Sequence, residues 1–557
     1  MQYRSLTRRV GDAVRLAELA QVLVRYGFAD VARRLGLYEG VPAKVLRRLH
    51  LIEQAPDVPE TMGSRMRAAL TELGPTFVKF GQILSTRPDL VGPAISAELS
   101  RLQDDVTALP FAEIKPIIEA ELKGPIERFF SEFNDTPVAA ASLSQVYRAK
   151  TQLGRDVAVK VQRPGIRRVI ESDLSLMRGV AEWVAEHVKD LEWMDPIGTV
   201  EEFARSIMRE LDFTVEAYII QRFRKNYSGM VSVFVPRVDF DLCGPRLLTM
   251  DWIDGIRVDA LDRYEERNCS PRTVAANGAD TLCKQIFEYH LFHADPHPGN
   301  ILVTRNDQIA FLDYGMVGHL EPTDVYAMAD LLRAVFEEDS QRCVEALLTF
   351  TVSGEIEDRA ELEHDVAEYI AFEARSVLGR ASVGKALEQV TNILRRHKLQ
   401  LAPRFSMLLK AMATIESSAK VLDPTMDMAP ILRPYVERIV MQRFSPQHLA
   451  KEGQRTLGTI LRIGKEIPGD IQQLIRTARK GRLRVHLDHE GLDHLAGVTD
   501  RASNRIAFSV IAGSLIVGSS LLLSSDFGAK SLGFLGFTIA GVLGIMLLIS
   551  ILRSRNY

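Results

Sequence analysis

The order of hydrophobic and polar positions divides the chain into stretches of different predicted secondary structure. Apolar residues recur at helical spacing from residue 1 to about 130, with interruptions at prolines. Between about 136 and 165 the pattern changes to short runs typical of β-strands, at 137–142, 145–149 and 156–161. These runs predict a small antiparallel sheet that follows a helical segment.

Helical spacing returns over 166–225, and a second pair of strands is predicted at 233–236 and 246–250. After residue 261 the chain again favours helices. Two short apolar runs interrupt this part and bracket a turn; they are 301–303 and 309–312, with the turn at 306–307. A small β-rich lobe followed by a large helical lobe is the order expected of a kinase-like fold.

Two long uncharged stretches lie near the end of the sequence. The first runs from Ala507 to Ser525 and the second from Ser531 to Leu552, so each is about long enough to cross a hydrocarbon layer of about 30 Å. The short segment between them, at 526–530, requires an antiparallel hairpin. We predict two transmembrane helices; a buried hairpin of a soluble core is the alternative.

Positive charges indicate how this hairpin would be oriented. Arg501 and Arg505 flank the first stretch, and Arg553 and Arg555 follow the second, so both outer ends and the main domain are expected on the cytoplasmic face of the inner membrane. Upstream, 451–484 combines basic residues with apolar ones at helical spacing, which suits anionic membrane lipid. A solvated charged helix is the other interpretation.

Length, net charge and cysteine spacing limit the number of structural units, the kind of partner and the redox compartment that we expect. A chain of 557 residues is long enough for three or four structural units. The net charge of −3 gives no general attraction to nucleic acid, and the four cysteines form no C-x-x-C pair, so we expect free thiols in a reducing compartment. The arginine-rich first 36 residues fit an amphipathic helix or an organelle transit peptide.

Three separated motifs suggest phosphoryl transfer, which needs cations and metal-held carboxylates around the phosphates. Lys160 ends a V-A-V-K strand that matches the lysine strand of kinases. The run 293–300 reads H-A-D-P-H-P-G-N, with Asp295 as the candidate base or nucleophile positioner and Asn300 as a magnesium ligand. Asp313 begins D-Y-G and is the second candidate ligand for Mg²⁺. The motifs predict a site for ATP and Mg²⁺.

Another enzyme class could use the same run, because His293, Asp295 and His297 form H-x-D-x-H, a spacing that can hold zinc or two metals. That interpretation leaves Lys160 and Asp313 without a role.

Two features argue against an ordinary protein kinase. The expected glycine-rich loop is replaced by an alanine-rich one, Ala139, Ala140, Ala141 and Ser142, in which each alanine adds a Cβ near the phosphates. Only eight residues separate Asp313 from Pro322, which leaves little room for a peptide-docking segment. We therefore expect a substrate other than a protein.

Taken together, these motifs resemble the UbiB family of atypical kinase-like proteins, which is associated with ubiquinone (coenzyme Q) biosynthesis. The resemblance covers roughly residues 60–430. It rests on the alanine-rich loop, the three motifs above and two further ones: the K-x-G-Q motif from Lys79 to Gln82, and the E-x-D motif from Glu210 to Asp212.

The resemblance implies an α+β, protein-kinase-like two-lobe fold with a helical N-terminal extension and a C-terminal transmembrane helical hairpin. It further implies that Lys160 pairs with Glu210 and binds the nucleotide phosphates. Lys79 and Gln82 would lie over the substrate cleft and reach toward Glu210 and Asp212. The expected domains are 1–130 (extension), 131–255 (N-lobe), 256–445 (C-lobe), 446–500 (basic amphipathic linker) and 501–557 (hairpin).

The implied function is an ATPase or kinase that supports ubiquinone biosynthesis, with quinone intermediates or biosynthetic enzymes as partners and no nucleic acid. One version couples ATP hydrolysis to the handling of lipid-soluble precursors. A small-molecule or lipid kinase, and a nucleotide-binding scaffold without catalysis, are the alternatives. The sequence also leaves a homodimer open.

Overall fold

The computed structural model describes residues 15, 18–28, 61–102, 106–352, 356, 358–374, 383–443, 492–524 and 530–553. The chain divides into two compact units, Met1–Ala450 and Lys451–Tyr557. Most of the predicted basic linker, at 446–491, lies outside the described residues, as does 29–60.

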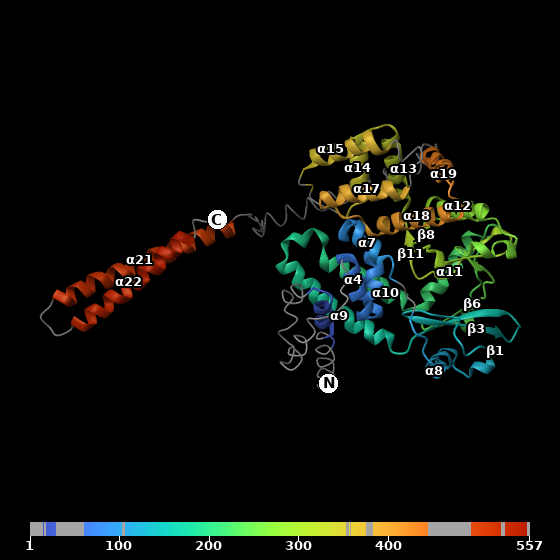
Figure 1. Cartoon of the computed structure of the whole chain (residues 1–557), viewed down its shortest axis with the longest axis horizontal. Helices are drawn as coiled ribbons and strands as arrows, with labels where there is room; N and C mark the ends of the chain where they lie inside the picture. Colours follow the sequence, from blue (N-terminus) through green and yellow to red (C-terminus); the bar gives the residue numbers. More distant parts are fainter. Residues whose placement is uncertain are drawn as a thin grey trace, which may run out of the picture. The chain divides into compact units, whose positions relative to one another are not determined.

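An antiparallel sheet forms the smaller lobe of the first unit (Figure 1). Its strand order is β1-β3-β4-β6, with β2 paired to β3. The odd-numbered valines of β4, from Val157 to Val161, are fully buried on one face, where α8 packs. This alternation sends Lys160 to the other face. The strands are β1 (Phe130–Phe133), β2 (Ala139–Ala140), β3 (Ser144–Thr151), β4 (Asp156–Gln162) and β6 (Leu247–Asp251); α8 is Phe111–Leu122.

The predicted second strand pair is partly wrong. Strands form at both places, but they belong to different sheets: β6 pairs with β4, whereas β5 (Val233–Phe234) pairs in parallel with β10 (Ile309–Phe311). Pairing partners are set by tertiary packing, which short apolar runs do not encode. The predicted hairpin around 306–307 is confirmed, since β10 pairs antiparallel with β9 (Ile301–Val303) and both turn residues have positive φ.

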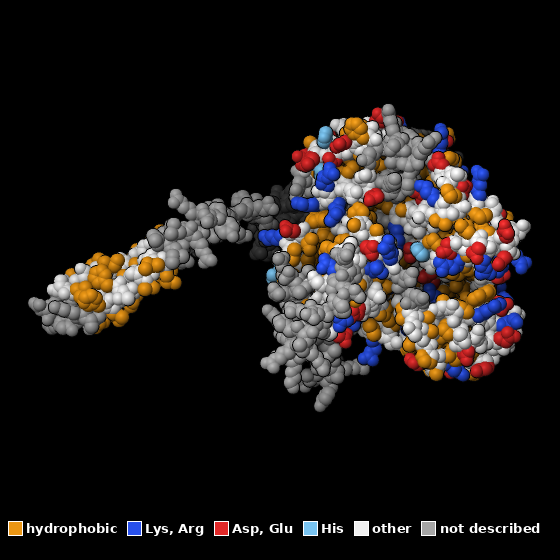
Figure 2. All heavy atoms as spheres, in the orientation of Figure 1, with side chains coloured by type: hydrophobic (Ala, Val, Ile, Leu, Met, Phe, Trp, Pro, Cys, Tyr) orange, Lys and Arg blue, Asp and Glu red, His pale blue; other side chains and the backbone are white. Residues whose placement is uncertain are grey.

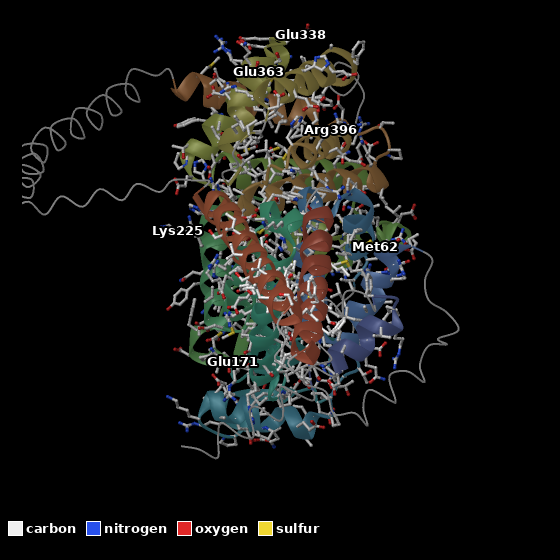
Figure 3. All side chains as sticks on the ribbon, turned by 90° about the vertical axis from the view of Figure 1, so that its left-hand side faces the viewer. Met62, Glu171, Lys225, Glu338, Glu363 and Arg396 are labelled. Carbon is white, nitrogen blue, oxygen red and sulfur yellow. The ribbon has the colours of Figure 1, made fainter. Side chains whose placement is uncertain are left out.

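Helices of the N-terminal extension and of the segment between β4 and β6 form a second hydrophobic cluster. Figure 3 places Met62, at the start of α4, and Lys225, near the end of α11, on opposite sides of the body. Proline or glycine begins or ends several of these helices, in keeping with the breaks in the sequence pattern. They are α4 (Met62–Leu73), α5 (Pro75–Leu84), α6 (Pro88–Val91), α7 (Pro93–Leu99), α9 (Ile166–His187) and α10 (Pro196–Glu210). The buried residues of α11 (Phe213–Asn226) belong instead to the cluster that fills the larger lobe.

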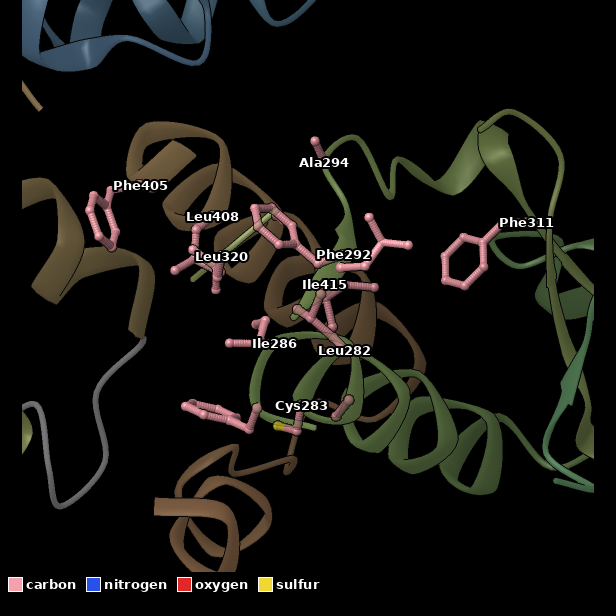
Figure 4. Packing of buried hydrophobic residues seen from close by; sticks show 14 of the residues in the cluster. Leu282, Cys283, Ile286, Phe292, Ala294, Phe311, Leu320, Phe405, Leu408 and Ile415 are labelled. Carbon is pink, nitrogen blue, oxygen red and sulfur yellow. The ribbon is translucent and has the colours of Figure 1, made fainter. Parts of the chain in front are cut away.

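The larger lobe is helical and carries three short strands besides the β9–β10 hairpin. Side chains from α12, β8, α18 and the residue after β11 meet in its core, among them Leu282, Phe292, Ile415 and Leu320 (Figure 4). The elements are β7 (Ile256–Arg257), α12 (Pro271–Phe287), β8 (Leu291–His293), β11 (Val317–His319), α13 (Pro322–Phe336), α14 (Ser340–Thr349), α15 (Arg359–Tyr369), α17 (Val383–Arg396), α18 (Pro403–Leu422) and α19 (Ala429–Arg443).

The second unit contains two helices that pack against each other, α21 (Leu492–Ser524) and α22 (Lys530–Arg553). A methyl group on Gly536 would overlap Ser519, so the small residues do allow close approach of the two backbones. Hydrophobic side chains cover much of the visible face of this hairpin (Figure 2). Within the described residues, no helix meets the length and hydropathy required of a membrane span. The hairpin is present, and its predicted insertion in a membrane stays a prediction.

Candidate active site

A cavity of about 410 Å³ lies between the two lobes of the first unit. Lys160, Asn300 and Asp313, which come from distant parts of the sequence, all line it. So do Ala139, Ala141 and Ser142 from the alanine-rich loop, whereas Ala140 is not among the lining residues. Apolar residues of β3, β4 and β6, together with Trp252 and Leu302, supply the walls. The arrangement offers a cation and two oxygen ligands at one side of a largely apolar pocket.

Lys160 is held by two carboxylates. Its Nζ lies 2.9 Å from both carboxylate oxygens of Glu216 and 3.3 Å from Oδ1 of Asp313. Burial alone would lower the pKa of Lys160, but the charges of Asp313 and Glu216 raise it above its ordinary value. The ammonium group therefore stays protonated and available to phosphate oxygens.

The implied pairing of Lys160 with Glu210 is wrong, because Glu216 occupies that place. Glu216 lies on α11 among the buried Phe213, Ala217 and Ile220, and burial raises its pKa to about 7. The sequence pattern could have identified Glu216, because an acidic residue within the apolar stripe of a predicted helix needs a buried partner.

Glu210, the last residue of α10, instead pairs with Lys79 of α5, at 2.9 Å. Lys79 is buried and also lines the cavity, so the N-terminal extension contributes a second cation to the cleft. Its charge helps to lower the pKa of Asp313.

The other members of these two motifs have different partners. The side-chain amide of Gln82 donates to the carbonyl of Leu102 at 3.2 Å. Asp212 caps α11 by accepting from the backbone N–H of Thr214 at 3.0 Å. These contacts of Gln82 and Asp212 are structural, and neither residue lines the cavity.

The segment after β8 brings Asn300 to the cavity, whereas Asp295 is not among the lining residues. Oδ1 of Asp295 lies 3.2 Å from Nζ of Lys410, on α18. Burial would raise the pKa of Asp295, but the charge of Lys410 holds it below its usual range. Lys410 belongs to none of the sequence motifs, and it lies beside Asp295 only because of how α18 packs. Because Asp295 is a weak base here, it is better suited to orienting a nucleophile than to removing its proton early.

His293 does not serve as a metal ligand. Its Nε2 hydrogen-bonds the carbonyl of Asp313, and its Nδ1 accepts from the backbone N–H of Asp295 at 3.2 Å. Burial lowers its pKa, so the ring is neutral. Across the described residues no group of three or more His, Cys, Asp or Glu could hold a metal ion, and the four cysteines are free. The H-x-D-x-H zinc alternative is therefore not formed.

The D-Y-G segment follows β10. Oδ1 of Asp313 accepts from the backbone N–H of Gly315 at 2.9 Å, which fixes the carboxylate toward the cavity. The pKa of Asp313, which burial would raise, is held well below its usual range, chiefly by Lys160 and Lys79. Tyr314 is fully buried, and its ring packs edge-on against Phe223 with centroids 5.1 Å apart. Its hydroxyl has no hydrogen-bond partner among the described residues, contrary to the expectation for a buried tyrosine.

The oxygen ligands present fit magnesium. Mg²⁺ prefers carboxylate and amide oxygens together with phosphates and water, and Asp313 and Asn300 share the cavity. Nδ2 of Asn300 donates to the carbonyl of Asp295 at 3.3 Å, which leaves its Oδ1 as the acceptor for a cation. Two protein ligands suit an ion that is shared with a nucleotide.

Known families match most of this first unit and the C-terminal hairpin. Residues 101–347 match the ABC1 atypical kinase-like domain, 376–427 match the UbiB helical domain, and 490–553 match the ABC1/UbiB kinase-like C-terminal domain. The first range includes Lys160, Asp295 and Asp313.

Curated relatives are similar over nearly the whole chain. A Clostridium pasteurianum protein, named as an uncharacterized protein in the hydrogenase 1 5′ region, is 30% identical over 97% of this chain and 99% of its own length. The probable protein kinase UbiB of Aliivibrio fischeri is 30% identical over 92% of this chain and 94% of its own. The probable protein kinase UbiB of Cellvibrio japonicus is 33% identical over 79% of this chain and 80% of its own length. The chain thus belongs to the UbiB family of ABC1 atypical kinase-like proteins.

Proposed function

We propose that this chain binds ATP with Mg²⁺ in the cavity between its lobes and hydrolyses it, or transfers its γ-phosphate, in support of ubiquinone biosynthesis. The observation that carries the proposal is the convergence of Lys160, Asn300 and Asp313 on one cavity. The role in ubiquinone biosynthesis rests on membership of the family and on the UbiB names of relatives.

Each residue has a defined part in this proposal. The ammonium group of Lys160, positioned by Glu216, contacts the α- and β-phosphates. Asp313 and Asn300 hold the metal, which when bound offsets the charge of the β- and γ-phosphates. Asp295 orients the attacking water or hydroxyl group. Ala139, Ala141 and Ser142 close over the phosphates.

Lys79 argues for a small acceptor. It is buried in the cleft and fixed to Glu210, so the N-terminal extension occupies space that a peptide substrate would need. The helix α13 also begins at Pro322, soon after Asp313, and leaves little chain for a docking segment. Water or a small molecule is the acceptor that this geometry favours.

The hairpin of the second unit supports attachment to anionic membrane lipid. Several of its large apolar side chains are exposed within that unit, including Ile506, Val510, Phe534 and Met546. Exposed apolar surface of this extent is typical of contact with lipid or with another protein. Attachment to the inner membrane would place the cavity near lipid-soluble quinone precursors. A second copy of the chain could cover the same surface, which would make the protein a homodimer.

The test of the proposed function measures ATP binding and phosphate release with Mg²⁺. We expect Asp313→Asn to reduce phosphate release at least 100-fold, because a metal ligand is lost. The matched control is Asp262→Asn, an exposed acid outside the cavity, which should behave like the wild-type protein. Equal activity of Asp313→Asn and wild type would refute the placement of the metal.

Cell-based measurements separate the alternatives. Accumulation of quinone precursors in cells that carry Asp313→Asn supports the ATP-dependent role. Label from γ-phosphate found on an extracted lipid or metabolite identifies a kinase. Normal quinone synthesis in cells whose Asp313→Asn protein is folded but inactive would support the third alternative, a nucleotide-binding scaffold without catalysis.

A further inference from the structure

A second cavity of about 410 Å³ is lined by residues of the N-terminal extension and of α17 and α18, Lys410 among them. None of the residues that line it was singled out by the sequence motifs. Hydroxyl side chains are frequent in its wall; they are Ser85, Thr86, Ser96, Ser100, Thr391, Ser406 and Thr414.

Ser406 is the unusual member of this wall. It is 2% exposed, and its hydroxyl has no hydrogen-bond partner among the described residues. By contrast, the hydroxyl groups of Ser96 and Ser100 donate to the carbonyls of Ser85 and Ala97, at 2.7 and 2.8 Å. A buried hydroxyl without a partner is costly, so a ligand that accepts its proton would relieve that cost.

Lys410 lies four residues after Ser406 on α18, and residues at that spacing are neighbours on one face of a helix. Its Nζ contacts Asp295 at 3.2 Å and Oγ of Ser85 at 3.5 Å. An ammonium group has three N–H donors. The cavity therefore presents a cation and an unpaired hydroxyl donor side by side, which is the chemistry that binds an oxyanion.

The remaining wall limits what the ligand can be. Pro88, Pro93, Ala97, Leu401 and Leu409 line the cavity, so part of the ligand should be apolar. Glu388 also lines it and would repel a doubly charged group. A single carboxylate on a short hydrocarbon body satisfies both conditions better than a phosphate does.

We propose that this cavity binds a small organic carboxylate through Lys410 and Ser406, and that binding draws Lys410 away from Asp295. Lys410 is a positioning residue for Asp295, since it acts on the carboxylate that would orient the nucleophile. The binding site is inferred from the residues that line the second cavity and does not depend on the proposed function, whereas its effect on catalysis rests on that function.

The test uses the full chain without nucleotide, with hexanoate as the probe and calorimetric titration as the measurement. We expect saturable binding that Lys410→Met abolishes and that Ser406→Ala weakens about fivefold, the equivalent of one hydrogen bond. Ser406→Ala should keep or raise the midpoint of thermal unfolding, because it removes a buried unpaired hydroxyl. The control is Ser418→Ala, also on α18, whose hydroxyl donates to Thr414 O at 2.8 Å and which should bind like wild type.

Competition between the two carboxylates gives a sharper result. Because Asp295 and the ligand share Lys410, Asp295→Asn should bind hexanoate several-fold more tightly than wild type does. Equal affinity of Asp295→Asn and wild type would overturn the link to Asp295. Equal binding of hexanol, or binding unchanged by Ser406→Ala and Lys410→Met, would overturn the site itself. These outcomes involve no ATP turnover, so they are independent of whether the proposed function holds.

Discussion

At the scale of single residues, each of the two lysines in the cleft is paired with at least one carboxylate. Lys160 contacts Glu216 and Asp313, and Lys79 contacts Glu210. Glu216 has the most buried side chain of this group, at 5% exposure, whereas that of Asp313 is 40% exposed. Glu216 is thus a fixed structural partner of the lysine, and Asp313 is the accessible one.

Removing the lysine charge tests this assignment. Lys160→Met leaves Glu216 buried without its partner and should lower the free energy of unfolding by about 3 kcal/mol. The double variant Lys160→Met/Glu216→Gln should regain at least half of this loss, because a glutamine can keep the hydrogen bond from the N–H of Tyr314. Urea unfolding of the three proteins is the measurement. A double variant no more stable than Lys160→Met would contradict the buried pair.

His293 makes stability depend on pH. Burial lowers its pKa in the folded protein, so below about pH 6.5 the unfolded chain binds a proton that the folded chain does not. This contribution to stability is complete above pH 6.5 and is lost as pH falls toward the folded pKa, by up to about 1.4 kcal/mol per pH unit. His293→Gln should unfold with a shallower pH dependence between pH 5 and 7. Parallel curves for variant and wild type would mean that folding does not change the pKa of His293.

At the scale of elements, β8 and β11 pair as a two-stranded sheet, and the D-Y-G segment comes just before β11 in the sequence. Gly318 of β11 lies opposite Phe292 of β8, and a Cβ on Gly318 would enter the Phe292 ring, which is fully buried. The ring therefore needs glycine at this position. The pairing holds His293 in register with Val317, next to the candidate catalytic loop.

Gly318→Ala should destabilise the protein by about 1–3 kcal/mol, because the added methyl group overpacks the core against a rigid ring. The control is Gly179→Ala in the middle of α9, where a Cβ meets nothing within 4 Å. That change should be neutral or stabilising by up to about 1 kcal/mol, since alanine is the better helix former. Thermal unfolding of both variants checks the contrast, which fails if Gly318→Ala is as stable as wild type.

Local patterns predicted the strand that carries Lys160, the strand that precedes Asp313, and the turn after β9, because alternation and turn residues are encoded in a few neighbouring positions. They did not predict β8 or β11, each of which is three residues long and owes its strand conformation to its partner. They also missed Lys410, which reaches Asp295 only through the packing of α18. Residues that act within one segment were predictable, whereas partners brought from a distant helix were not.

At the scale of the whole first unit, a buried carboxylate joins the N-terminal extension to the larger lobe. Asp89 of α6 is fully buried and pairs with Arg87, at 2.9 Å. Its Oδ2 also accepts from the backbone N–H of Leu401 at 3.1 Å, across 312 residues of sequence. The segment that ends in Leu401 leads into α18, the helix of Lys410 and Ser406. The same junction thus supports the second cavity.

Breaking this junction should have a large effect. Asp89→Ala leaves the Leu401 N–H without its acceptor and the buried Arg87 charge with only Glu202, at 3.9 Å, so the free energy of unfolding should fall by about 3–5 kcal/mol. Asp89→Asn keeps an acceptor for Leu401 and should cost less. For comparison, Glu337→Ala removes the exposed ion pairs with Arg333 and Arg342 and should cost less than about 1 kcal/mol. Denaturant unfolding gives these values, and hydrogen exchange at Leu401 should quicken in Asp89→Ala but not in Glu337→Ala. If Asp89→Ala were no more destabilising than Glu337→Ala, the extension would be held to the larger lobe by its apolar contacts alone.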